Sequence, residues 1–294
     1  MALLALIAVT VVWGVTFVQV KDAVEVYPLF AFLAVRYAIA AGVLGVVAMP
    51  RVRALGRSGL LAGGVLGVLL GVGIGLQTAG LERTTVSSTG FITGLYVVLT
   101  PLFGLVLFRT RVGLEVWLGV VLSVTGLAML SGVHVGSTTG DLLVLASTSA
   151  QALQIVMVER YANRYDAIAL TFVEMATCCL GFFAITLALG DLSVPRGWTV
   201  WGALLVTGVF ASALAYLIQI WAQRRLSAAR IALVFALETV FAGIFGYWLS
   251  GDRLGWLGWG GCGAILGGIA LAEPAAASAL RRLAGRQPGG VETA

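Results

Sequence analysis

The sequence predicts an all-α integral membrane protein, with ten transmembrane helices arranged as two inverted five-helix repeats around a central cavity. Its composition, its continuous apolar runs and a similarity between its two halves support this prediction. Hydrophobic residues make up 60% of the chain and charged residues 11%, whereas a soluble domain is about 45–50% apolar and about 25% charged. The apolar runs lack the period of two typical of membrane β-barrel strands, so helices are favoured.

Ten apolar runs are long enough to be transmembrane helices, each of which takes about 20 residues. The first five cover residues 3–20, 29–49, 59–80, 86–108 and 112–131. The second five cover residues 140–158, 167–189, 199–221, 228–249 and 255–272. We therefore expect a first repeat over 1–132, a second repeat over 140–272 and a cytoplasmic tail over 273–294.

The basic residues favour one orientation in the membrane. Loops after the odd-numbered runs hold Lys21, Arg83, Arg196 and Arg253, and Arg36 lies inside the second run. The other 13 of the 18 Lys and Arg residues lie around the ends of the even-numbered runs and in the tail. Because cytoplasmic loops carry an excess of Lys and Arg, we expect both termini in the cytoplasm. No basic segment precedes the first run, which favours a retained helix over a cleaved signal peptide.

The two halves of the chain resemble each other at nearly constant offsets. At an offset of 138 residues, Arg36 aligns with Glu174. From the third run onward the offset is 142 residues, and it pairs Gln77 with Gln219, Tyr96 with Glu238, Gly119 with Gly261, and Gly126 with Gly268. Since five helices is an odd number, the two halves run in opposite directions through the membrane. Inverted repeats of this kind are typical of secondary transporters, whose sites lie near the bilayer midplane.

The ninth run carries a carboxylate, Glu238, near its centre. An ionised side chain at that depth costs roughly 2.5–3.5 kcal/mol and normally faces a bundle interior or a wet cavity. At 1.5 Å per residue Glu238 is about 15 Å deep, and Tyr96 reaches the same depth from the other side. Glu238 therefore either attracts a cationic group of a solute or a proton, or carries a proton and bonds a neighbouring helix.

Further aromatic and polar residues are expected to form a substrate site with Glu238. An aromatic wall with a few hydrogen-bonding groups suits a small amphipathic solute. The alternative is that the aromatic residues only pack and that the polar ones only bond neighbouring helices. The predicted site consists of Trp13, Thr16, Gln77, Thr93, Tyr96, Gln151, Tyr216, Phe235 and Glu238.

Two charged residues inside other runs, Arg36 and Glu174, are placed differently. Each lies about 10 Å from a membrane face, and the two faces are opposite. We therefore do not expect a direct pair between them, and either side chain could extend to the nearer interface.

Small residues mark two further features. Gly63, Gly67, Gly71 and Gly75 form a ridge with a spacing of four, which lets helices approach closely. This ridge is either a static packing seam or a seam that slides during transport, and Pro101 in the fourth run is a candidate hinge. The glycines of the tenth run fit packing within the chain and a homodimer contact equally well.

Several function classes find no support in the sequence. The only lysine is Lys21, so a phosphate-binding loop has no lysine to use. The single histidine, His134, has no partner for a metal site, and the three cysteines lie in apolar runs without ligand spacing. No catalytic motif or cofactor is expected. The net charge of +5 does not indicate nucleic acid, because the basic residues lie between apolar runs.

The sequence resembles the EamA-type members of the drug/metabolite transporter superfamily over residues 3–272. The resemblance rests on Val12-Trp13-Gly14, Arg36-Tyr37, TVSSTGFITGLYVVLTP at 85–101 and SAARIALVFALET at 227–239. The chain has Thr239 where the family often has proline after glutamate, so a proline kink in the ninth run is not expected from this sequence. It also reads FRTRV at 108–112, where the family favours Gly-Glu-Arg-Leu.

This resemblance implies a secondary transporter that exports amino acids, aromatic and hydrophobic ones among them, and related small metabolites. It implies alternating access around a central cavity in a bacterial inner membrane, with the solute and the lipid bilayer as partners. Two other classes remain open, a structural or regulatory membrane subunit without a solute path and a channel. The channel is disfavoured because no ring of acidic or carbonyl-presenting residues is evident.

Overall fold

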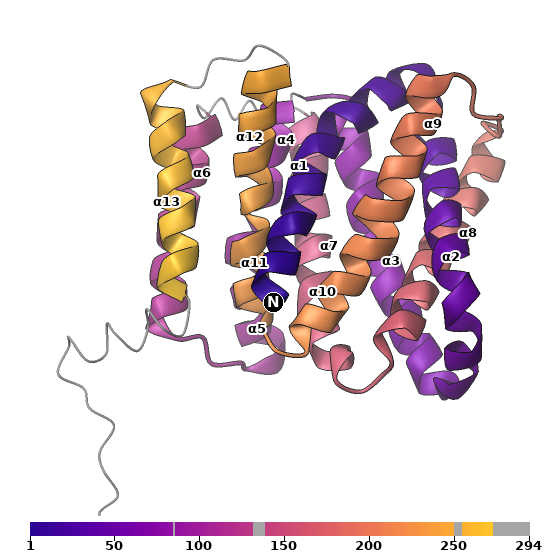
Figure 1. Ribbon diagram of the computed structural model, residues 1–294, viewed down its shortest axis with the longest axis horizontal. Helices are drawn as coiled ribbons and strands as arrows, with labels where there is room; N and C mark the ends of the chain where they lie inside the picture. The colour runs from indigo at the N-terminus through magenta and orange to yellow at the C-terminus, as the bar shows by residue number, and fades with distance from the viewer. Residues whose placement is uncertain (85, 132–138, 250–254, 273–294) are drawn as a thin grey trace, which may run out of the picture.

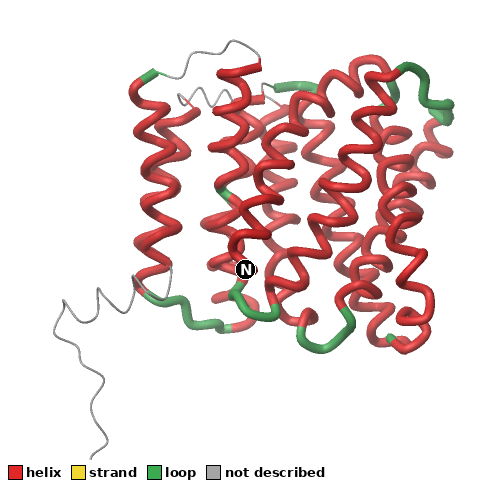
Figure 2. Tube along the Cα trace, in the orientation of Figure 1, coloured by secondary structure: helices red, strands yellow, loops and turns green. Residues whose placement is uncertain are grey.

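The structure is a computed structural model, and it describes residues 1–84, 86–131, 139–249 and 255–272. The predicted tail, His134 and Arg253 lie outside the described residues. All regular elements in the described part are helical (Figure 2). The first half contains α1 Ala2–Val26, α2 Leu29–Ala54, α3 Gly56–Leu81, α4 Val86–Gly94, α5 Tyr96–Phe108 and α6 Leu114–Ser131. The second half contains α7 Thr139–Ala162, α8 Ala167–Leu189, α9 Trp198–Leu205, the π-helix η1 Val206–Leu214, α10 Ala215–Gln223, α11 Ala228–Phe235, α12 Leu237–Leu249 and α13 Trp256–Ala272.

These helices account for the ten predicted spans. Among the described residues, eight helical stretches are long and apolar enough to cross a membrane, and 114–130 and 256–272 are shorter apolar helices. Three spans are composite: the fourth is α4 with α5, the eighth is α9 with η1 and α10, and the ninth is α11 with α12. The helices lie side by side between two faces (Figure 1).

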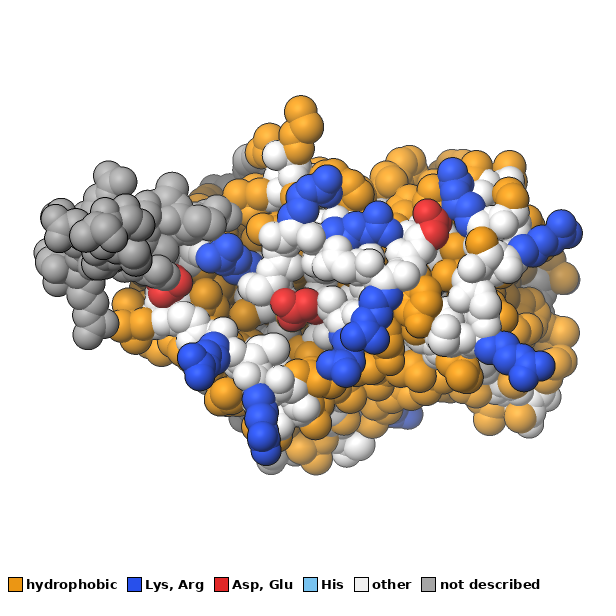
Figure 3. Space-filling model, turned by 90° about the horizontal axis from the view of Figure 1, so that it is seen from below, with side chains coloured by type: hydrophobic (Ala, Val, Ile, Leu, Met, Phe, Trp, Pro, Cys, Tyr) orange, Lys and Arg blue, Asp and Glu red, His pale blue; other side chains and the backbone are white. Residues whose placement is uncertain are grey.

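We call the two faces the N face and the distal face. The N face carries the connections 109–113, 163–166 and 224–227, and the distal face carries 27–28 and 190–197. Lys and Arg side chains are spread over the N face (Figure 3). The basic residues that follow the even-numbered runs in the described part of the chain therefore gather on this face.

Helices of the two halves interleave. α3 packs against α7 and α8, and α1 packs against α12 and the eighth span. α2 packs against its repeat equivalent α8, and α6 packs against its equivalent α13 at the end of the molecule shown at the left of Figure 1. This interleaving places residues from both halves around the centre.

The seam between α6 and α13 shows the two-fold relation between the halves directly. A Cβ added to Gly119 would lie 2.5 Å from the carbonyl oxygen of Gly268, and one added to Gly126 would lie 2.6 Å from that of Gly261. Under the offset of 142 residues, each of these contacts maps onto the other. Such spacing leaves no room for a side chain, so the glycines are what permits the close approach.

The glycine ridge of α3 is tight at one end and loose at the other. A Cβ on Gly67 would lie 2.5 Å from Thr177 Cβ, whereas one on Gly71 would be 3.7 Å from Cys178 Sγ. Gly63 is as crowded as Gly67, and Gly75 is intermediate. α3 and α8 therefore diverge toward the distal face and leave an apolar groove of about 690 Å³ between them.

The two central spans, the fourth and the ninth, are both interrupted near the same depth. The fourth is broken at Leu95, directly after Gly94, a poor helix former, and six residues before Pro101. The ninth is broken at Ala236, without a proline, and Ala236 N bonds both Ala232 O and Leu233 O at 3.2 Å. No residue type near Ala236 explains this break. Discontinuous helices at the midplane are typical of transporter sites.

Candidate functional site

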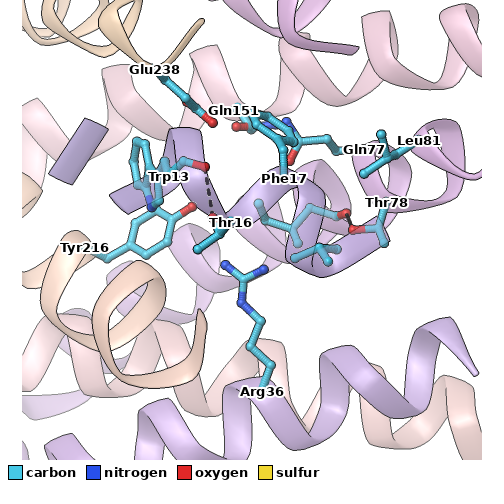
Figure 4. A pocket seen from close by; sticks show the side chains of 12 residues that line it. Trp13, Thr16, Phe17, Arg36, Gln77, Thr78, Leu81, Gln151, Tyr216 and Glu238 are labelled. Carbon is cyan, nitrogen blue, oxygen red and sulfur yellow. Dashed lines mark hydrogen bonds between the residues drawn. The ribbon is translucent and has the colours of Figure 1, made fainter. Parts of the chain in front are cut away.

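A small cavity lies at the centre of the bundle, between residues of both halves (Figure 4). Its volume is about 50 Å³. This is room for a few waters, since one water needs roughly 10–15 Å³ of accessible space. Small-molecule pockets are usually about 300–1,000 Å³. A metabolite therefore requires the surrounding helices to move apart. The lining residues are Trp13, Thr16, Phe17, Val20, Arg36, Ile74, Gln77, Thr78, Leu81, Gln151, Tyr216 and Glu238.

Glu238 enters the cavity from the broken ninth span. The break at Ala236 makes Glu238 a first-turn residue of α12, where unpaired backbone N–H groups favour a carboxylate. Its repeat equivalent Tyr96 also lies in the first turn after a break, as the first residue of α5 after Leu95. The Tyr96 hydroxyl lies 3.5 Å from Glu238 Oε2, a long and therefore weak hydrogen bond. The broken spans thus bring two repeat equivalents into contact at the centre.

Arg36 enters the cavity from α2, across from Glu238 (Figure 4). Its Nε donates to Ser212 Oγ at 2.9 Å, and the residue is 7% exposed. Ser212 belongs to η1, which approaches α2 closely because Gly208 has no side chain: a Cβ there would lie 3.0 Å from the Arg36 carbonyl oxygen. A π-helix in an otherwise α-helical span often marks a functional position. Here it presents the hydroxyl that orients the guanidinium.

The aromatic wall is built around Trp13. Its Nε1 donates to the carbonyl oxygen of Ala211 at 2.9 Å, and its ring lies 4.8 Å from that of Phe235 and 5.7 Å from that of Tyr216. Gly14 lets α1 reach α12, since a Cβ there would lie 2.8 Å from Phe241 Cβ. The indole is therefore held from two sides, by η1 and by the ninth span.

Two amides complete the polar part of the cavity. Gln77 Nε2 donates to Thr93 Oγ1 at 3.0 Å, and Gln151 Nε2 donates to Ser147 Oγ at 2.9 Å. Gly73 makes room for the second amide, because a Cβ there would lie 2.7 Å from Gln151 Cγ. Each amide is oriented by a hydroxyl behind it.

Hydrogen bonds also join neighbouring segments at each of the two faces. On the distal face the Tyr27 hydroxyl donates to the carbonyl oxygen of Ser193 at 2.6 Å. Burial raises the pKa of Tyr27, so this phenol stays a neutral donor at physiological pH. On the N face Arg224 donates to the carbonyl oxygens of Ala162 and Tyr165 at 2.9 and 2.8 Å.

Comparison with known proteins identifies the family. The model of the EamA-like transporter family matches residues 1–132 and 138–272. The chain belongs to the EamA-like transporter family. An uncharacterized transporter of Archaeoglobus fulgidus is 30% identical over 245 residues, 82% of this chain and 76% of the relative. The uncharacterized inner membrane transporter YedA of Escherichia coli is 27% identical over 286 residues, 91% and 89% of the two chains.

A solved crystal structure has the same fold as this EamA-like transporter. The TM-score is 0.75, the identity is 21%, and the match covers 96% of this chain and 98% of the other. The predicted family and the all-helical multi-span fold are thus confirmed, and the protein is a multi-pass membrane transporter. The family match speaks against the structural or regulatory subunit.

The structure brings most of the predicted site residues of the EamA-like transporter together. Trp13, Thr16, Gln77, Gln151, Tyr216 and Glu238 line the cavity. Thr93, Tyr96 and Phe235 lie one layer behind, against Gln77, Glu238 and Trp13. None of the lining residues comes from α5, so Pro101 lies outside the cavity.

Some lining residues were not predicted from the sequence. Arg36 was not among the predicted site residues, and its side chain was expected to be able to extend to the nearer interface. α1 contributes Trp13, Thr16, Phe17 and Val20, and α3 contributes Ile74, Gln77, Thr78 and Leu81. Both sets have the spacing i, i+3, i+4, i+7 of one helix face. That period, applied from Trp13 and Gln77, would have found the others.

Proposed function

We propose that this EamA-like transporter exports amino acids by alternating access between the halves 1–132 and 140–272. Arg36 and Glu238 carry the proposal, because opposite charges on opposite walls of one central cavity match the carboxylate and ammonium of a zwitterion. A guanidinium pairs with a carboxylate through strong charge-assisted hydrogen bonds. Trp13 and Tyr216 offer flat apolar surface to a side chain, which favours aromatic and hydrophobic amino acids.

The small volume of the cavity supports a carrier rather than an open channel. The cavity that the described residues form has space for only a few waters, so it is too small to hold a metabolite. Solute therefore enters only when one face opens. The inverted arrangement of the halves supports a mechanism in which the two faces open by equivalent movements.

A counterflow panel in proteoliposomes tests this proposal. The panel holds an aromatic amino acid, the corresponding amine without its carboxylate, and the N-acetyl acid without its ammonium. We expect saturable exchange of the zwitterion and at least tenfold slower exchange of either analogue. Equal rates for all three would contradict zwitterion recognition. Flux without saturation would identify a channel, and no flux of any member would reject the transport of amino acids.

The orientation is part of the same proposal. The basic N face is placed in the cytoplasm, as cytoplasmic loops are rich in Lys and Arg. Cysteines placed singly at Arg53 and Arg196, in a variant without Cys178, Cys179 and Cys262, check it. An impermeant thiol reagent added to intact cells should label the cysteine at 196 and spare the one at 53. The reverse pattern would invert the orientation.

A further inference from the structure

A chain of buried polar side chains lies between α7, α8 and α10, apart from the cavity. Glu174 Oε1 accepts from Gln154 Nε2 at 2.8 Å, and Gln154 Oε1 accepts from Gln219 Nε2 at 3.0 Å. Gln219 Nε2 also donates to Gln223 Oε1 at 3.1 Å, and Gln223 Nε2 donates to the carbonyl oxygen of Ile155 at 2.8 Å. All four side chains are at most 2% exposed. We call this set the amide ladder.

The amide ladder contains more acceptors than donors. Glu174 Oε2 and Gln219 Oε1 are both buried, and neither has a hydrogen-bond partner. An ionised carboxylate therefore has one amide donor where several are usual, at a depth where an unpaired charge costs several kcal/mol. A proton on Oε2 removes the charge and turns one unpaired acceptor into a donor.

The groups that face Glu174 offer no better compensation. α2 contributes Tyr37, α10 contributes Tyr216, and α8 itself contributes Cys178. None of these three is a cation, and the nearby Arg36 of α2 is bound to Ser212 and lines the cavity.

The remaining neighbours are uncharged. The Cys178 thiol donates to the carbonyl oxygen of Gly67 at 3.2 Å. α3 lies close to the backbone of α8 here, since a Cβ on Gly67 would lie 2.6 Å from the Glu174 carbonyl oxygen. α7 presents the Gln154 amide, which cannot neutralise a carboxylate.

We propose that Glu174 is a proton-binding site of this transporter, occupied in the present conformation and separate from the cavity carboxylate Glu238. The two carboxyls differ in what they face: Glu238 lines the cavity, and Glu174 does not. The ligand of Glu174 is therefore small enough to fit within a packed helix junction, which a proton is. The proposal that Glu174 binds a proton does not depend on the proposed function.

The position of the amide ladder links this proton to the opening of the N face. The ladder ends at Gln223, next to Arg224, whose bonds to the carbonyl oxygens of Ala162 and Tyr165 join the end of α10 to the end of α7 and to the connection that follows it at the N face. Parting α10 from α7 breaks the bond from Gln219 to Gln154 and the bond from Gln223 to the Ile155 carbonyl oxygen, and it admits water to Glu174. Loss of the proton then favours the conformation open to the N face, because water stabilises the charge. This coupling rests on the proposed function.

Infrared difference spectroscopy on the purified protein, without solute, tests the proton site. At neutral pH we expect the carbonyl-stretch band of a buried carboxylic acid that is lost in Glu174→Gln, shifted in Glu174→Asp and retained in Glu238→Gln. Glu174→Gln keeps the shape and an acceptor for Gln154, and Glu174→Asp serves if that variant fails to yield monodisperse protein. A band unchanged in both Glu174 variants would overturn the proposal. Loss of the band on adding sodium at constant pH would show a sodium site and also overturn it.

The coupling is tested by counterflow of an aromatic amino acid between pH 5.5 and 8.5. This range covers roughly the pKa values of shifted carboxyl groups. We expect Glu174→Gln to exchange solute with a flattened pH profile, and Glu174→Asp to retain a pH dependence. A profile identical to that of the natural protein would reject the coupling. Absence of counterflow in the natural protein, with the infrared band present, would reject the proposed function and leave the proton site intact.

Discussion

The central cavity and the seam between α6 and α13 use the internal repeat in opposite ways. In the seam, Gly119 and Gly126 face Gly268 and Gly261, so repeat equivalents are identical. At the centre, Glu238 meets its equivalent Tyr96, and Arg36 corresponds to Glu174. Where the two halves only pack, symmetry-related positions need the same small volume. Around the central cavity and at the Arg36–Glu174 pair of positions, equivalent residues differ in charge.

Removing the charges of the cavity should have the largest effect. Leaving one partner of a close charge pair unmatched costs roughly 2–5 kcal/mol, which is at least about 30-fold in exchange rate at 1.4 kcal/mol per factor of ten. We expect that loss for a zwitterion in Glu238→Gln and in Arg36→Gln, measured by counterflow of monodisperse protein.

Analogues of the solute supply the controls for these two variants. The N-acetyl acid, which lacks an ammonium, should be indifferent to Glu238→Gln, and the amine should be indifferent to Arg36→Gln. A zwitterion carried by Glu238→Gln at the natural rate would refute a charge role and leave Glu238 as a helix-packing residue.

Filling the glycine seam should lower stability rather than alter solute choice. A leucine at Gly126 has its Cβ 2.6 Å from the Gly261 carbonyl oxygen, and overpacking costs about 1–3 kcal/mol. We expect Gly126→Leu to unfold at lower temperature, with unchanged relative rates for the zwitterion and its analogues. Gly263→Leu is the matched control, because nothing lies within 4 Å of a Cβ there. Equal melting of the two variants would show that the seam is not tight.

The smallest effect is expected where the aromatic wall meets the π-helix. Trp13→Phe keeps an aromatic ring but removes the hydrogen bond from Nε1 to the Ala211 carbonyl oxygen. Such a bond contributes a net stabilisation of about 0.5–1.5 kcal/mol. KM for an aromatic amino acid should rise about two- to tenfold, by the same conversion. Trp198→Phe, at a position that is 80% exposed, should leave KM unchanged. A KM that does not move in Trp13→Phe would mean that the bond does not position the wall.

The sequence by itself determined the class of protein, the ten apolar spans, the family and the pairing of equivalent residues. The class, the spans and the pairing follow from composition and from periods along one chain, and the family follows from the resemblance of short motifs; all of these are local properties. The helical period places Trp13 and Thr16 on one face of α1. In all, six of the nine predicted site residues line the cavity.

The tertiary structure decided which side chains face one another across helices. The direction of Arg36 depends on Ser212, 176 residues away, and on the close approach that Gly208 permits. Depth along a helix does not reveal rotation about its axis, so Arg36 could not be separated from a residue that reaches an interface. The break at Ala236 has no signal in its residue types, and the amide ladder joins three helices. Both depend on contacts between spans, which no single span encodes.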